Sequence, residues 1–151
     1  AEGTSNLGID SNSTLRGGEG ADSIEGGLGA DVLYGGAVDG PDDGETDTLS
    51  GGAGDDEINL GEADSGAGGE GADTFVRSDT VTGRVLITDF DGADDVIVVH
   101  HQDDTPPTLD NQVIASDGVI LEFSDGSRVE LEGLIEEIDE SLISFVDTRQ
   151  T

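Results

Sequence analysis

Five aspartates that recur in step with five apolar residues are the part of this sequence best suited to do chemistry. They are Asp22, Asp31, Asp47, Asp56 and Asp73, and an apolar residue stands two places after each of them. Carboxylates are hard oxygen ligands of the kind that calcium prefers. The chain has no cysteine, and no histidine lies in the repeating segment. The pattern therefore favours calcium over zinc or copper, while magnesium prefers a tighter octahedral site and keeps its water.

Each of these aspartates belongs to a nine-residue repeat with glycine at three of its first six positions. Four full copies begin at Gly17, Gly26, Gly51 and Gly68. A fifth copy opens with Gly35 and closes over residues 46–50, so that a loop insertion separates its two parts. Residues 8–16 are expected to form a weak starting turn and residues 60–67 a degenerate copy. Internal repeats of this kind indicate a solenoid of stacked turns.

The repeat is too short to fold without its neighbours. Its glycines allow left-handed backbone and inward-facing carbonyls, and its short apolar segment is stable only when it stacks on another coil. Neighbouring strands lie ~4.7–4.9 Å apart. Calcium–oxygen distances of ~2.3–2.6 Å place two oxygens on opposite sides of one ion about 4.6–5.2 Å apart. A calcium ion therefore fits between stacked turns.

Two repeats make one coil, so each repeat is expected to stack on the next but one. One edge then stacks Asp31, Asp56 and Asp73, and the other stacks Asp22 and Asp47, with Asp64 of the degenerate copy as a candidate third member. Carboxylates about 5 Å apart repel by roughly 3 kcal/mol per pair at an effective dielectric constant of about 20. A bound dication would convert this repulsion into attraction.

The repeat G-G-x-G-x-D-x-U-x resembles the repeats-in-toxin (RTX) nonapeptide. The resemblance implies an all-β fold, a right-handed parallel β-roll with calcium in its turns. It also implies that the aspartates are ligands and that the glycine positions supply backbone carbonyls. The metal-site residues implied in this way are Gly17, Gly18, Gly20, Asp22, Gly26, Gly27, Gly29, Asp31, Gly35, Asp47, Gly51, Gly52, Gly54, Asp56, Gly68, Gly69, Gly71 and Asp73. We expect several Ca²⁺ ions, about three to six.

Beyond Val76 glycine becomes scarce and longer apolar runs begin. Residues 85–90 and 96–99 are predicted to be strands on either side of an acidic turn. This part resembles the segment that commonly follows the last repeat in secreted RTX proteases and in alginate epimerase repeat modules. In that setting Asp91, Asp94 or Asp95 could add ligands or cap the roll, and a solvated turn is the alternative.

The remaining residues predict a mostly β cap. Runs at 119–123 and 128–132 flank Asp125-Gly126, which favours a hairpin with a type I′ turn. A short helix is expected near the end, because the apolar residues there have helical spacing; they are Leu134, Ile135, Ile138 and Leu142. Such a cap would cover a sheet edge that otherwise templates aggregation.

These observations predict three parts. Residues 1–7 are a linker or the start of a cap, residues 8–76 the roll, and residues 77–151 the C-terminal cap. The family resemblance suggests a type I secretion signal at about residues 133–151. The alternative is that this segment only completes the core of the cap.

Charge and composition exclude several functions. With 36 acidic against 5 basic residues and a net charge of −31, the chain is a poor partner for nucleic acid. Its apolar runs fall far short of the ~20 residues that cross a bilayer. No catalytic set is evident, and adjacent His100 and His101 on a strand would face opposite sides rather than share one metal. The acidic stretch 39–45 resembles part of an EF-hand loop but has Pro41 where a ligand belongs.

We therefore expect a non-catalytic, calcium-binding module of an exported bacterial protein. It would fold on binding Ca²⁺ outside the cell and support type I secretion and stability of its parent, with the secretion apparatus as a candidate partner. The alternative is an auxiliary or binding module of a larger secreted enzyme or adhesin, gripping polysaccharide or a surface. One Tyr, four Phe and no Trp offer few stacking platforms for sugars, which weakens a carbohydrate-binding role.

Overall fold

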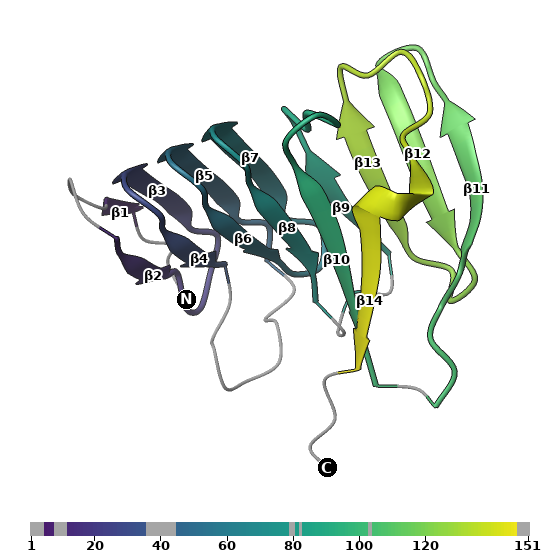
Figure 1. Cartoon of the computed structure of the whole chain (residues 1–151). Helices are drawn as coiled ribbons and strands as arrows, with labels where there is room; N and C mark the ends of the chain where they lie inside the picture. Colours follow the sequence, from purple (N-terminus) through teal and green to yellow (C-terminus); the bar gives the residue numbers. More distant parts are fainter. Residues whose placement is uncertain are drawn as a thin grey trace.

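The structure is a computed structural model, and it describes residues 5–7, 12–35, 45–78, 81, 83–102 and 104–147. The predicted loop insertion falls largely at 36–44, outside the described residues, as does most of the EF-hand-like stretch. Described strands form two facing sheets whose short members stack from the N-terminal end toward a hairpin region (Figure 1).

One sheet contains, in spatial order, β1 (Ser5–Leu7), β3 (Ser23–Leu28), β5 (Thr48–Ala53), β7 (Ser65–Glu70), β9 (Arg84–Ile87), β13 (Arg128–Glu132), β12 (Gly118–Phe123) and β11 (Leu109–Ile114). The other contains β14 (Ile143–Asp147), β10 (Val96–His101), β8 (Thr74–Arg77), β6 (Glu57–Leu60), β4 (Val32–Tyr34) and β2 (Thr14–Arg16). Every pairing is parallel except those of β12 with β11 and β13. This confirms the predicted all-β, parallel roll architecture.

Strand register confirms that each repeat stacks on the next but one. Ile24 pairs with Leu49 in one sheet, and Leu33 pairs with Ile58 in the other. From β1 to β10 successive strands alternate between the two sheets, so two repeats complete one coil. Equivalent turns consequently lie above one another along each edge of the roll.

The apolar residue of each repeat points between the sheets and forms the core. Ile24, Leu33, Leu49, Ile58 and Phe75 are each at most 1% exposed. In the degenerate copy this position is Gly66, where an added Cβ would lie 3.0 Å from side-chain carbons of both Ile58 and Leu60. The missing side chain thus leaves room for larger neighbours.

Both sheets continue past the last repeat without a break in pairing. β10 adds to β8 with Phe75 opposite Ile97, and β9 adds to β7 with Gly66 opposite Ile87. The predicted strands at 96–99, 119–123 and 128–132 are present, and the one predicted over 85–90 is present as β9 but ends at Ile87. β11 was not predicted. β14 then pairs in parallel with β10 and forms the end of its sheet.

The predicted short helix is reduced to a single 3-10 turn, η1 (Glu140–Leu142). Two hydrogen bonds from outside the segment explain why. The Gln112 side chain donates to the Ile138 carbonyl and accepts from the Ile138 N–H, both at 2.9 Å, which occupies groups that a helix would use. Ile135 is 82% exposed, so the apolar spacing does not define one buried face. No helix in the described residues is long and apolar enough to span a membrane.

The hairpin between β12 and β13 is present, but its turn is not type I′. A type I′ turn needs positive φ at both central residues. Gly126 has φ of 90°, whereas Asp125 is not among the residues with positive φ. The Asp125 carboxylate instead accepts the Ser127 N–H at 2.9 Å, and this bond holds a longer turn.

Candidate metal centre

Aspartates along one edge of the roll form a continuous hydrogen-bonded column. The Asp31 N–H donates to Asp56 Oδ1 at 2.8 Å, and the Asp56 N–H donates to Asp73 Oδ1 at 2.9 Å. Ser13 begins the column by donating its N–H to Asp31, and Asp95 extends it by accepting the Asp73 N–H at 2.9 Å. The predicted order of Asp31, Asp56 and Asp73 is confirmed.

The opposite edge carries a second column. The Asp22 N–H donates to Asp47 Oδ1 at 2.7 Å, and the Asp47 N–H donates to Asp64 Oδ1 at 2.8 Å. Asp64 also accepts the Gly61 N–H through Oδ2, which tightens its own turn. Asp47 keeps its place in the column despite the insertion before it, and the candidate Asp64 is its third member.

The second carboxylate oxygen of five of these aspartates accepts no hydrogen bond. The Oδ2 atoms of Asp22, Asp31, Asp47, Asp56 and Asp73 are buried without a hydrogen bond. Each of the five residues is at most 3% exposed. Burying a charged oxygen without compensation is costly, and buried charges are normally paired or bound to metal. The columns therefore require positive charge that the roll does not supply.

These oxygens point into the space beside the first glycine of each turn. A Cβ built on Gly17, Gly26, Gly51 or Gly68 would lie under 3.0 Å from Oδ2 of the aspartate in the same turn. At Gly17, Gly26 and Gly51 it would also lie under 3.0 Å from the carbonyl oxygen of the first glycine in the next turn along that edge. We call each such space a cradle. Only glycine leaves it open.

The fifth cradle, at Gly35, has two carboxylate oxygens beside it instead of one carboxylate and one carbonyl oxygen. There the Oδ2 atoms of both Asp47 and Asp64 lie under 3.0 Å from the position of an added Cβ. The degenerate turn thus contributes a carboxylate where the regular turns contribute a carbonyl.

The donor set of the cradles fits calcium. Among the described residues, no group of three or more His, Asp or Glu side chains gathers as a metal site. The cradles at Gly17, Gly26 and Gly51 instead combine one carboxylate with one backbone carbonyl, and the cradle at Gly35 combines two carboxylates. These are hard-oxygen sets typical of calcium. The remaining predicted glycines turn the backbone around them with positive φ; these are Gly18, Gly20, Gly27, Gly29, Gly52, Gly54, Gly69 and Gly71. All the predicted site residues therefore lie in stacked turns, and their assignment as ligands stays a prediction.

Crowding of carboxylates changes their acidity. The pKa of Asp73 is raised to about 6, mainly by burial and also by the neighbouring carboxylates of Asp95, Asp56 and Asp89, although the hydrogen bond from Asp56 lowers it. Burial also raises the pKa values of Asp56 and Asp95. Protons therefore compete with a cation for the same oxygens.

Of the three candidate residues in the acidic turn after β9, only Asp95 joins a column. It is 3% exposed, whereas Asp91 and Asp94 are exposed. Asp91 accepts the Ala93 N–H and donates its own N–H to Asp95. A sequence signal for Asp95 exists, because Ile97 follows it two places later, as in the regular repeats.

Two parallel sheets joined by stacked, aspartate-lined turns define the class of β-roll proteins. A family model, the RTX calcium-binding nonapeptide repeat in four copies, matches residues 7–40 and 43–75. Over these residues the stacked turns are therefore RTX calcium-binding nonapeptide repeats.

Solved structures with a similar course of the chain come from two proteins, an epimerase and a lipase. The AlgE6R3 subunit of the Azotobacter vinelandii mannuronan C5-epimerase is 24% identical, with a TM-score of 0.49, over 93% of this chain and 77% of that one. The AlgE6R2 subunit of the same enzyme is 26% identical, with a TM-score of 0.37, over 96% and 94%. The extracellular lipase LipA of Serratia marcescens is 18% identical, with a TM-score of 0.45, over 97% of this chain but only 40% of the lipase. No curated protein matched the chain.

Proposed function

We propose that this RTX repeat module is a calcium-dependent folding unit of an exported bacterial protein. The observation that carries the proposal is the set of buried Oδ2 atoms of Asp31, Asp56 and Asp73, which accept no hydrogen bond. They face glycine-lined cradles, so the same residues that build the turns also create the demand for a cation. Calcium is the hard-oxygen dication that such a site prefers.

Calcium would act by stabilising the folded chain alone. Each ion that binds only the folded state adds RT ln(1 + [Ca]/Kd), about 2.7 kcal/mol at a hundredfold excess over Kd. Extracellular calcium modules typically bind at ~10⁻⁴–10⁻³ M. The chain would therefore stay largely unfolded at the low calcium levels inside a cell and fold after export.

Charge supports the same behaviour. A net charge of −31 opposes compaction through self-repulsion, and binding several dications would reduce that charge. An unfolded, acidic chain suits passage through a narrow channel. In this proposal residues 8–76 are the calcium-binding roll and residues 77–151 close its end, with about residues 133–151 as the secretion signal.

Small-angle X-ray scattering tests the folding step. We expect a radius of gyration of about 40 Å in chelator and about 15 Å in excess calcium, the values for an unfolded and a folded chain of this length. A compact chain in chelator would overturn the proposed dependence on calcium.

Export is tested separately. A reporter fused ahead of the whole chain should leave bacterial cells that contain a type I apparatus and remain inside cells that lack it. Equal retention in both strains would remove the secretion role and leave calcium-driven folding intact. A role as an auxiliary polysaccharide-binding module has less support, because Phe75, Phe90 and Phe123 are buried rather than available for stacking.

A further inference from the structure

Turn 68–73 is the last regular turn on its edge, so no nonapeptide turn follows to close its cradle. The turn that starts with Gly17, on the opposite edge, shows how the next turn closes a cradle with one carbonyl oxygen. At the turn that starts with Gly17, the Gly18 N–H donates to the Gly35 carbonyl at 3.1 Å. The same Gly35 oxygen lies 2.5 Å from the position of a Cβ on Gly17, which places it at the cradle.

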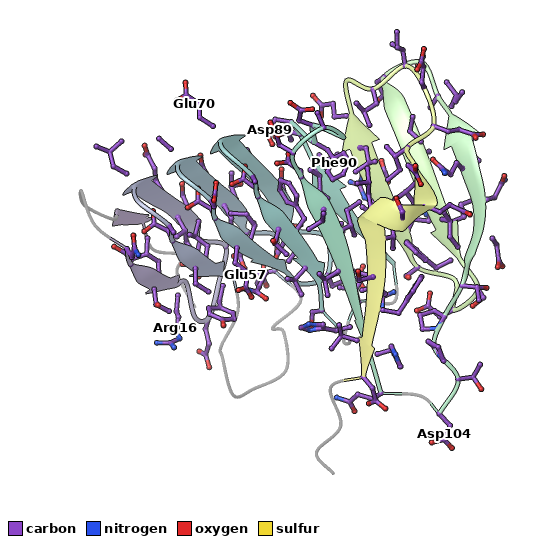
Figure 2. The ribbon with its side chains drawn as sticks, in the orientation of Figure 1. Arg16, Glu57, Glu70, Asp89, Phe90 and Asp104 are labelled. Atoms are coloured by element: carbon purple, nitrogen blue, oxygen red, sulfur yellow. The ribbon has the colours of Figure 1, made fainter. Side chains whose placement is uncertain are left out.

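Asp89 takes the place of that carbonyl in the last turn. The Gly69 N–H, the equivalent of the Gly18 N–H, donates to Asp89 Oδ2 at 2.8 Å. The Gly68 N–H donates to Asp89 Oδ1 at 2.9 Å, as the Gly17 N–H donates to the Tyr34 carbonyl. Figure 2 shows Asp89 on the same rim of the roll as Glu70, which follows Gly69 in the chain.

A second observation points to a cation at this position. Asp73 is 1% exposed, its Oδ2 has no hydrogen bond, and that atom is the nearest one to a Cβ built on Gly68. The ion pairs of Arg77 with Asp125 and of Arg84 with Glu130 use other carboxylates. Each carboxylate oxygen of Asp89 accepts one hydrogen bond and keeps a further lone pair for a metal.

We propose that Asp89, which lies outside the repeats, is a calcium ligand that closes the Gly68 cradle opposite Asp73. This inference rests on the proposed calcium function and adds a ligand to it. Calcium affinity depends on the number of charged ligands. The Gly68 cradle would pair two carboxylates, whereas those at Gly17, Gly26 and Gly51 pair a carboxylate with a carbonyl. It should therefore bind calcium more tightly than they do.

Isothermal calorimetry and ion counting on the whole chain test this assignment. Asp89→Asn keeps a side chain of the same size but removes the charge. We expect it to lose one bound ion per chain, or to weaken the tightest sites roughly tenfold, which corresponds to about 1.4 kcal/mol. Glu70→Gln is the matched control, because it removes one charge from the same exposed rim. It should keep the number of ions and their affinities.

Two results would overturn the assignment. One is an Asp89→Asn variant with the ion count and affinities of the unmodified chain. The other is the absence of a lanthanide anomalous peak between Asp73 and Asp89 in crystals of the unmodified chain, a measurement that does not depend on the variant folding. Failure of the unmodified chain to bind any calcium would instead overturn the proposed function itself.

Discussion

Asp47, Asp56 and Asp73 each use their two carboxylate oxygens differently. Oδ1 accepts the N–H of the aspartate one coil earlier, which fixes the side chain and joins neighbouring turns. Oδ2 is left facing a cradle. A single residue therefore links the stacking of the coils to the demand for a cation.

Asp56 lies in the middle of one aspartate column, between Asp31 and Asp73. Asp22 is the first described member of the other column. Asp56→Ala would remove the acceptor of the Asp31 N–H, a loss of about 1–3 kcal/mol for a buried donor, together with one cradle ligand. We expect the calcium midpoint of folding to rise more for Asp56→Ala than for Asp22→Ala. Calcium titrations of the two variants followed by circular dichroism measure this difference, and equal midpoints would contradict the stacking order.

The acidity of Asp73 predicts a pH dependence for the calcium-free chain. Because burial raises its pKa from 3.8 to about 6, the metal-free fold binds a proton more tightly than the unfolded chain does. This contribution to stability is fully present below about pH 4 and is lost as pH rises through about 6. Without calcium, we expect more β structure at pH 5 than at pH 8.

Circular dichroism of the calcium-free chain and of its Asp73→Asn variant at the two pH values checks this. The variant should show a smaller change, since one titrating carboxylate is gone. A calcium-free chain with no change in β content between pH 5 and pH 8 would contradict the assigned environment of Asp73.

The residues of the site could be predicted largely because spacing survives in the sequence. The five aspartates share a fixed relation to an apolar residue, and all five lie in the columns. Asp95 was only one of three candidates, because the segment before it has lost the glycines of the repeat. No repeat spacing in the sequence pointed to Asp89 as a site residue. Its position depends on how the chain continues from β9 to lie beside the last turn.

At the scale of elements, the first glycine of each turn decides whether a cradle exists. In Gly51→Ala the added methyl would overlap Asp56 Oδ2 and the Gly68 carbonyl oxygen. We expect this variant to lose one calcium site and to need several-fold more calcium to fold. Gly92→Ala is the control, since its nearest atom would be Leu142 Cδ1 at 3.7 Å, an ordinary contact. Calcium counting that found the same number of ions in both variants would refute the cradle as the binding space.

A buried arginine joins the last strand of the repeats to the hairpin. Arg77 is 2% exposed, and its guanidinium donates to Asp125 Oδ2 at 2.8 Å, to the Ser127 hydroxyl and to the His100 carbonyl at 2.7 Å. Although burial raises the pKa of Asp125, the hydrogen bonds from Arg77 and Ser127 outweigh it and hold that pKa below its ordinary value. β8, β10 and the β12–β13 turn are thus joined through one side chain.

Removing this guanidinium should destabilise the calcium-bound fold. We expect Arg77→Leu to lower the free energy of unfolding by about 1–3 kcal/mol, less than for a fully buried pair because Asp125 is 30% exposed. Arg84→Leu breaks an exposed pair with Glu130 and should cost about 0–1 kcal/mol. Urea unfolding in saturating calcium compares them; equal losses would show that the Arg77 contacts add no stability beyond those of a surface pair.

The sequence predicted a strand correctly where its regularly spaced apolar residues are also the residues that are buried in the structure. The repeat strands and β9, β10, β12 and β13 follow their apolar residues. The expected helix did not form because Gln112, distant in sequence, bonds both backbone groups of Ile138. β11 was missed because its residues, LDNQVI, lack a clear alternation of apolar and polar side chains.

At the scale of the whole molecule, one continuous hydrophobic core connects the repeats to the C-terminal strands. Ile24 near the beginning and Ile143 near the end of the chain belong to the same buried cluster. The aspartate columns run beside this core and end at Asp64 on one edge and Asp95 on the other. Folding of the roll and of the C-terminal strands should therefore be one cooperative event that depends on calcium.

The central prediction is that the whole chain folds in one cooperative step that depends on calcium. Far-UV circular dichroism during a calcium titration that starts in chelator measures this step, and magnesium is the control ion. We expect a single cooperative change from coil to β structure with calcium and none with magnesium at the same concentration. A β spectrum that is already complete in chelator and unchanged by calcium would contradict calcium-dependent folding of the chain. The core and the Arg77 contacts would then hold the fold without a cation.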